Sequence, residues 1–112
     1  MKRLTPNTED VRKTIKRSLE KVPGIRCLFV YGAFAEKEAP AGTGVDLIVI
    51  GGPDLEELEE VVSGVEKKVG RSIRVYSFTL GEFKEKIKVR DRFVKKALSA
   101  SKTMLIGDVS NL

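Results

Sequence analysis

Histidine, tryptophan and glutamine are missing from this 112-residue sequence, and it contains a single cysteine, Cys27. Without histidine the chain lacks the commonest general base and zinc ligand, so zinc chemistry and Ser-His or Cys-His triads are excluded. A lone cysteine cannot form a disulfide within the chain, and its apolar neighbours indicate a small buried residue in a reducing compartment. The missing glutamine, together with abundant lysine, arginine and glutamate, favours a thermophilic source.

Long apolar runs are also missing. The longest, Val45 to Ile50, has the length of a strand and not of a membrane span. Met1-Lys2-Arg3 leads into a charged helical pattern without an apolar signal region, which predicts a cytoplasmic protein with no membrane partner. With 41% hydrophobic and 33% charged residues, the whole chain, 1–112, is expected to form one domain. The net charge of +5 permits a nucleotide or nucleic-acid partner without requiring one.

Four stretches have the apolar periodicity of amphipathic helices. They are expected at residues 6–21, 54–69, 79–88 and 91–99. Thr5 or Asn7 is available to cap the first of them. Asp54 and Thr79 each stand three residues before a glutamate, which is the spacing of a capping box, and Gly70 is a typical helix stop. These signals predict where three of the four helices begin or end.

Four shorter stretches predict strands, at residues 25–31, 45–50, 72–78 and 103–106, with a short helical turn near 33–37. The first strand is apolar almost throughout, which predicts cover on both of its faces. The third alternates, so that Arg74, Tyr76 and Phe78 share one face, where the two aromatic rings either stack on a base or, as we expect, pack against a helix. The order of elements predicts an α/β (α+β) fold, a small mixed sheet with helices packed mainly on one face.

Asp46 lies within the apolar second strand. Placing a carboxylate among branched aliphatic residues costs free energy, unless a cation pairs with the carboxylate or the carboxylate belongs to a functional site. Arg74 and Asp46 are both expected on the open side of adjacent strands, and we therefore predict that they form an ion pair. Before this strand, Gly32 opens a turn of small residues at the end of the first strand, a shape that also suits phosphate binding.

The segment from Tyr31 to Ile50 resembles the signature of the DNA polymerase β-like nucleotidyltransferase superfamily. Small prokaryotic members carry Gly-Ser, one residue and Ala-Arg-Gly, then a variable loop and Ser-Asp-x-Asp before an apolar run. This chain has Gly32-Ala33-Phe34-Ala35 and then Gly44-Val45-Asp46 at the corresponding places. The similarity to the small archaeal branch extends over about residues 18–108 and includes 19–24, 69–71, 79–83 and 105–108. It implies a nucleotidyltransferase-like fold.

The resemblance also implies a site for two Mg²⁺ ions and a nucleotide triphosphate. Gly32 and Ala33 match the phosphate-binding turn, and Asp46 matches the second aspartate, a metal-binding and catalytic position. Three positions depart from the family pattern. Ala33 replaces the phosphate-binding serine, Gly44 replaces the first aspartate, and Arg74 lies on the strand that supplies the third carboxylate. We therefore expect metal-dependent transfer to be severely impaired or absent.

Three functions remain open at this point. The first is a catalytically degenerate module that binds a nucleotide or has a regulatory role. The second is an active Mg²⁺-dependent enzyme that transfers a nucleoside monophosphate to a hydroxyl. In that second case Glu36 or Glu38 would join Asp46 at the metal. The third, implied by the resemblance, is an antitoxin-like subunit for a helical partner protein, with a homo-oligomer as a further assembly. Seven basic residues between Lys84 and Lys96 predict a solvated helix surface, with a nucleic-acid patch as the alternative.

Overall fold

The computed structural model describes residues 8–35 and 42–112, and in this part of the chain helices and strands follow in the predicted order. They are α1 (Thr8–Leu19), β1 (Ile25–Tyr31), η1 (Gly32–Ala35), β2 (Val45–Gly51), α2 (Leu55–Val69), β3 (Ile73–Phe78), α3 (Leu80–Lys88), α4 (Arg92–Ser99), β4 (Lys102–Ile106) and η2 (Val109–Asn111). The four strands agree with the predicted ranges to within one residue at each end. The predicted start of the first helix and its caps, Thr5 and Asn7, lie outside the described residues, as does the end of the predicted turn near 33–37.

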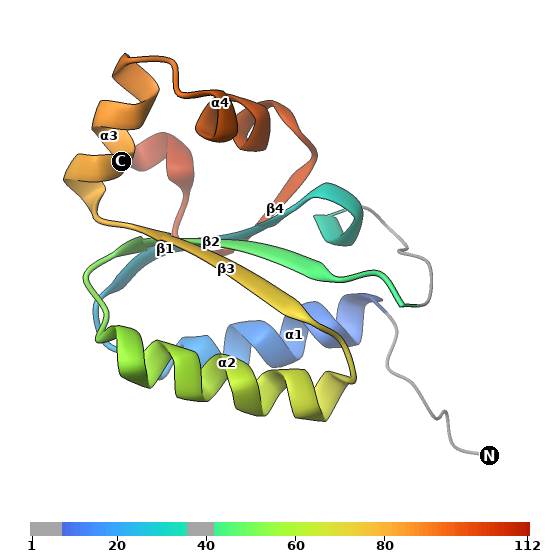
Figure 1. The fold of residues 1–112 in the computed structure, drawn as a ribbon. Helices are drawn as coiled ribbons and strands as arrows, with labels where there is room; N and C mark the ends of the chain where they lie inside the picture. Colours follow the sequence, from blue (N-terminus) through green and yellow to red (C-terminus); the bar gives the residue numbers. More distant parts are fainter. Residues whose placement is uncertain (1–7, 36–41) are drawn as a thin grey trace.

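The strands form one mixed sheet in the order β3-β2-β1-β4, so β3 and β4 are its edges (Figure 1). β1 is antiparallel to both of its neighbours, whereas β2 and β3 are parallel and are joined through α2. The register places Asp46 between Tyr31 on β1 and Arg74 on β3. Three residues that are far apart in the sequence therefore meet in one row across the sheet.

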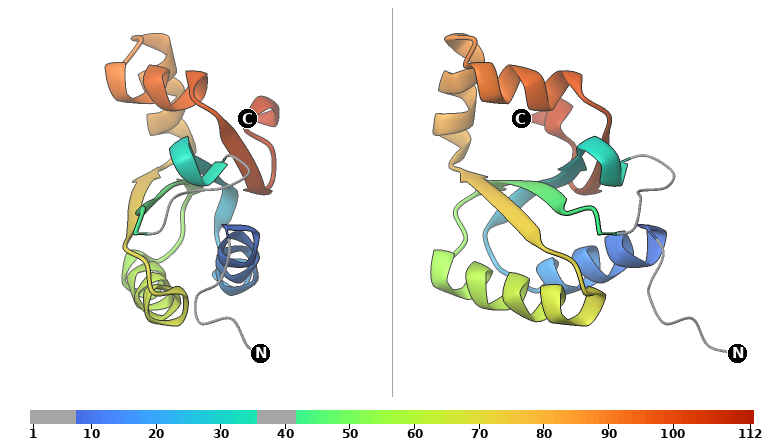
Figure 2. Two further views of the ribbon diagram at one scale, coloured as in Figure 1. Left: turned by 90° about the vertical axis from the view of Figure 1, so that its right-hand side faces the viewer. Right: turned by 45° about the vertical axis from the view of Figure 1, so that its right-hand side comes forward.

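Helices cover both faces of the sheet, and this differs from the expectation that they pack mainly on one face. α1 and α2 lie side by side under one face, and α3 and α4 lie on the other side (Figure 2). The reason is the alternation of the central strands: Leu28 and Val30 point toward α1 and α2, while Cys27 and Phe29 point the opposite way. All four side chains are fully buried, so the second face also needs a cover, as the apolar character of the first strand predicted.

The helix ends follow the local signals in the sequence. Asp54 accepts a hydrogen bond from the Glu57 N–H at 3.1 Å, and Gly70 ends α2 in a left-handed conformation. Thr79 and Glu82 form the complete predicted capping box of α3. α2 has 15 residues, and within residues 8–35 and 42–112 no helix combines the length and the apolar character that a membrane crossing requires.

Candidate functional site

Asp46 is the second residue of β2, next to the edge of the apolar core. Its neighbours Val45 and Leu47 pack toward α1 and α2, so the alternation of the strand directs Asp46 to the face that α3 and α4 cover. The side chain is 24% exposed, less than that of a free surface carboxylate, because the strands on both sides screen it. A partly buried carboxylate in this position requires a partner.

Arg74 is that partner, and the ion pair predicted from the sequence is confirmed. The Arg74 Nε donates to Asp46 Oδ1 at 2.8 Å, and its Nη2 donates to Oδ2 at 3.4 Å. The hydrogen bond to Asp46 and the charge of that carboxylate raise the pKa of Arg74. Two-thirds of the Arg74 side chain stays exposed, at 66%, so the guanidinium both covers the carboxylate and faces solvent. Both carboxylate oxygens are thus engaged by one cation.

An aromatic cluster lies beside this ion pair. Tyr76 packs on Phe93 of α4 with a ring-centroid distance of 4.7 Å, and Tyr31 contacts Phe93 edge-on at 6.2 Å. Phe78 lies 5.7 Å from Phe83 of α3. The expected packing of Tyr76 and Phe78 against helices is therefore confirmed. Phe93 was not singled out in the sequence, where its only signal is a place in a helical apolar stripe.

Tyr31 has an unusual acidity in this setting. Burial, followed by the negative charge of Asp46 and by Tyr76, raises the pKa of Tyr31 from its ordinary value of 10.0 to about 12, while Arg74 acts in the opposite direction. The folded state therefore holds the phenol proton more tightly than the unfolded state does. The resulting stabilisation is complete below pH 10 and is lost as the pH rises from 10 to about 12.

We expect Tyr31→Phe to remove this part of the alkaline destabilisation. Urea unfolding of the wild type and the variant between pH 9 and pH 12 measures the change in stability, over the range in which free tyrosine titrates. The ultraviolet absorbance of tyrosinate follows the ionisation of Tyr31 in the same samples. The two unfolding midpoints should differ by a constant amount below pH 10 and converge above it. A pH-independent difference between the midpoints would contradict the raised pKa of Tyr31.

The turn after β1 is held firmly by its surroundings. Gly32 has φ +83° and its N–H donates to the Ser101 carbonyl oxygen at 2.9 Å. Arg12 Nη1 donates to the Phe34 carbonyl oxygen at 2.7 Å, and Thr103 Oγ1 donates to that of Ala35 at 2.9 Å. No sequence motif signals these three contacts, because they join α1, Ser101 and β4 to a distant turn. The Gly32 amide proposed for phosphate binding already has an acceptor in this structure.

The acidic groups described here do not fit the two Mg²⁺ ions that the resemblance implies. Gly44 contributes no side chain and Asp46 is engaged by Arg74. Among residues 8–35 and 42–112, no group of three or more histidine, cysteine, aspartate or glutamate side chains lies close enough to hold a metal ion. Glu36 and Glu38, the alternative ligands, lie outside the described residues. Two Mg²⁺ ions need several oxygen ligands each, and one paired carboxylate does not supply them.

No family model matches the sequence, and the comparison with curated proteins finds no match. The fold, in contrast, resembles several solved structures. A mutant of the toxin–antitoxin pair MntA–HpeT aligns with a TM-score of 0.61 and 10% identity, over 89% of this chain and 76% of that one. A tri-AMPylated HEPN toxin with its MNT antitoxin from Shewanella oneidensis aligns with a TM-score of 0.59 and 10% identity, over 93% and 76%. A toxin–antitoxin with AMP-PNP aligns with a TM-score of 0.60 and 12% identity, over 89% and 76%.

At these identities the likeness concerns the fold alone. The chain has a nucleotidyltransferase-like fold, as the resemblance implied.

Proposed function

We propose that this chain is a nucleotidyltransferase-fold protein that has lost metal-dependent nucleotidyl transfer and acts as a binding or regulatory module. The observation that carries the proposal is the ion pair between Arg74 and Asp46, with Nε 2.8 Å from Oδ1. A guanidinium at this distance supplies the positive charge that a metal ion would otherwise bring to the carboxylate. It also repels a divalent cation that approaches the same oxygens.

Arg74 suggests what the module binds. Its side chain is 66% exposed, and its guanidinium lies at the margin of the sheet beside the turn-bearing end of β1. An exposed guanidinium has further N–H donors that can contact a phosphate group without a metal ion. We therefore propose a nucleotide triphosphate as the ligand, bound independently of Mg²⁺.

Titration of ATP into the purified protein, with Mg²⁺ and with EDTA, tests both parts of this proposal. We expect the same affinity in both conditions and no transfer of label from α-labelled ATP. Arg74→Gln should weaken ATP binding about tenfold or more, which is about 1.4 kcal/mol of binding free energy. Lys84→Gln removes one exposed charge from α3 and is the matched control.

Label transfer that requires Mg²⁺ and stops in Asp46→Asn would overturn the proposal. It would establish the active transferase, with Asp46 and either Glu36 or Glu38 at the metal. If ATP binds in neither condition, a nucleotide is not the ligand, but the proposed loss of metal-dependent transfer is unaffected.

A second candidate is an antitoxin-like subunit for a helical partner protein. Two apolar side chains at the end of α3 favour it, since Ile87 and Val89 are 47% and 62% exposed. Three solved structures of similar fold are of toxin–antitoxin proteins, which supports a protein partner here. Co-purification of a stable helical protein, lost in the variant Ile87→Lys with Val89→Lys, would support this candidate.

A further inference from the structure

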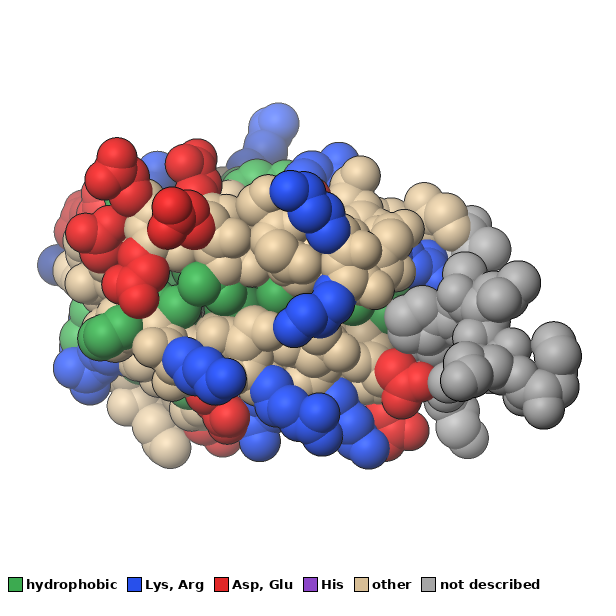
Figure 3. Space-filling view, turned by 90° about the horizontal axis from the view of Figure 1, so that it is seen from below, with side chains coloured by type: hydrophobic (Ala, Val, Ile, Leu, Met, Phe, Trp, Pro, Cys, Tyr) green, Lys and Arg blue, Asp and Glu red, His purple; other side chains and the backbone are tan. Residues whose placement is uncertain are grey.

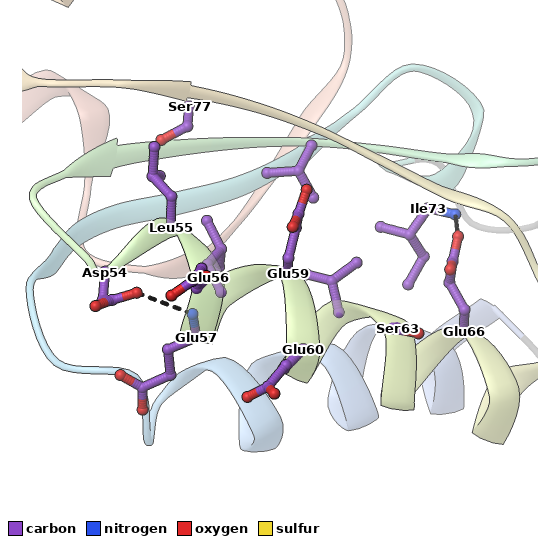
Figure 4. Close-up of a pocket in the computed structure, with 13 residues that line it drawn as sticks. Asp54, Leu55, Glu56, Glu57, Glu59, Glu60, Ser63, Glu66, Ile73 and Ser77 are labelled. Atoms are coloured by element: carbon purple, nitrogen blue, oxygen red, sulfur yellow. Dashed lines mark hydrogen bonds between the residues drawn. The ribbon is translucent and has the colours of Figure 1, made fainter.

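A hollow of about 1000 Å³ lies between α2 and the edge strand β3 (Figure 4), and neither Asp46 nor Arg74 lines it. Its apolar lining comes from both elements: Leu55, Leu58 and Val62 on the helix, and Ile73 and Val75 on the strand. Leu58 and Val62 are buried at its floor, whereas Leu55 is 62% exposed at its mouth. An apolar side chain that is so exposed over a hollow with apolar walls indicates a contact surface.

The backbone of β3 forms one wall of this hollow. The Val45 N–H donates to the Ser72 carbonyl oxygen, so the even-numbered residues of β3 direct their backbone groups to β2. The odd-numbered residues Ile73, Val75 and Ser77 direct theirs to the outer edge of the sheet. Glu66 accepts a hydrogen bond from the Ile73 N–H at 2.7 Å, which protects the first of these groups. Val75 and Ser77 present the next N–H and carbonyl groups along the same edge.

Acidic side chains form the rim. Glu56, Glu57, Glu59 and Glu60 all line the hollow; Glu59 points from α2 toward the sheet, whereas Glu57 and Glu60 point away from it (Figure 4). Acidic side chains gather at one end of the face that α1 and α2 form, in a chain whose net charge is +5 (Figure 3). The helix dipole accounts for acids in the first turn of α2, but its effect falls off before Glu59 and Glu60. The charge of Glu59 beside the apolar hollow is complementary to a cationic ligand.

We propose that this hollow is a docking site for an extended, lysine- or arginine-rich segment of a partner protein. The segment adds a strand to the edge of β3 and pairs with the backbone groups of Val75 and Ser77. Because side chains of a strand alternate, every second residue points toward α2; among these residues the apolar ones pack on Leu55 and Leu58, and the basic ones lie near Glu59. The docking site requires neither a nucleotide nor a metal ion, so its test is independent of the test of the function proposed above.

Other ligands fit this surface less well. The glutamates of the rim repel the phosphates of a nucleic acid. An amphipathic helix would contact the apolar floor but would leave the edge groups of Val75 and Ser77 without partners. A basic strand satisfies the apolar, electrostatic and hydrogen-bonding features together.

The probe, called the lysine–valine peptide, is a blocked nine-residue peptide whose odd-numbered residues are alternately valine and lysine and whose other residues are serine. Fluorescence anisotropy measures its binding to the full chain at low ionic strength. We expect a dissociation constant in the micromolar range and at least tenfold weaker binding of a glutamate–valine peptide of the same pattern. Amide hydrogen exchange at Val75 and Ser77 should slow when the lysine–valine peptide is bound, since both N–H groups gain acceptors. Attraction by charge alone would leave their exchange unchanged.

Two pairs of variants separate the parts of the site. Glu59→Lys should weaken binding of the lysine–valine peptide about tenfold, whereas Glu85→Lys, the same charge change on α3, should not. Ser77→Pro removes an N–H from the free edge and leaves the ladder to β2 intact, whereas Ser77→Ala keeps that N–H. We expect loss of binding in Ser77→Pro only. Circular dichroism checks that the proline variant is folded, and the exchange experiment on the wild type does not depend on it.

Unchanged exchange at Val75 and Ser77 with saturating peptide, or equal effects of Glu59→Lys and Glu85→Lys, would overturn the proposal. A dimer of the chain in analytical ultracentrifugation that Ser77→Pro dissociates would also overturn it, because the edge of β3 would then pair with a second copy.

Discussion

A double variant, Gly44→Asp with Arg74→Asp, is expected to bind Mg²⁺ at least tenfold more tightly than the wild type. Positions 44 and 46 are two residues apart at the start of β2, so their side chains point to the same side. A Cβ added at Gly44 lies 3.5 Å from the Ser72 carbonyl oxygen, an ordinary contact, so the fold accepts a side chain there. Position 74 is paired with Asp46 across β2 and β3, which brings the third carboxylate to the same place.

Calorimetric titration with MgCl₂ measures the gain, and the thermal midpoint should rise most with Mg²⁺ concentration in the double variant. A tenfold tighter dissociation constant adds about 1.4 kcal/mol of stabilisation at saturating metal. Each single variant is a control. Gly44→Asp keeps Arg74 on Asp46, and Arg74→Asp lacks the first carboxylate, so we expect smaller gains from either one. An affinity for Mg²⁺ that is equal in the wild type and the double variant would show that the carboxylates do not converge.

Gly51→Ala is expected to destabilise the protein by about 3 kcal/mol, the range of a severe backbone substitution. Gly51 ends β2 with φ +145°, a conformation that residues with a Cβ rarely adopt. An added Cβ would collide with the Gly24 carbonyl oxygen and lie 2.8 Å from the Arg26 amide nitrogen. Both atoms belong to the backbone, so relief requires a shift of the strand ladder between β1 and β2.

Gly64→Ala is the matched control, because Gly64 is exposed in the middle of α2 and a Cβ there meets nothing within 4 Å. We expect it to stabilise the helix by about 0.5–1 kcal/mol. Urea unfolding of both variants at pH 7 measures the two effects. If Gly51→Ala unfolds at the same urea concentration as the wild type, the close approach of β2 to Gly24 does not exist in solution.

Local chemistry made most of the fold predictable. The caps at Asp54 and Thr79 and the stop at Gly70 act within a few residues, and the corresponding helix ends appear where the sequence placed them. The alternation of β3 likewise directed Arg74 and Tyr76 to one face and Ile73 to the other. The distribution of the helices was the part predicted wrongly, because it depends on which element covers Cys27 and Phe29, and that contact joins distant residues.

The candidate site was predictable to a smaller extent. The pairing of Asp46 with Arg74 followed from charge and strand alternation, and it is confirmed. The acceptor of the Gly32 N–H was not predictable, since Ser101 lies far along the chain and has no motif of its own. The roles of Asp46, Gly32 and Ala33 in binding remain predictions.

The amino-acid sequence was enough to place the helices and strands, and to show that position 33 has no hydroxyl and position 44 no carboxylate. These are properties of single residues and their near neighbours. Charge and alternation suggested the pairing of Arg74 with Asp46, but its two-point contact and the apolar hollow beside β3 appear only in the three-dimensional structure. Both depend on sheet register and on the packing of α2, which arise when segments distant in sequence come together.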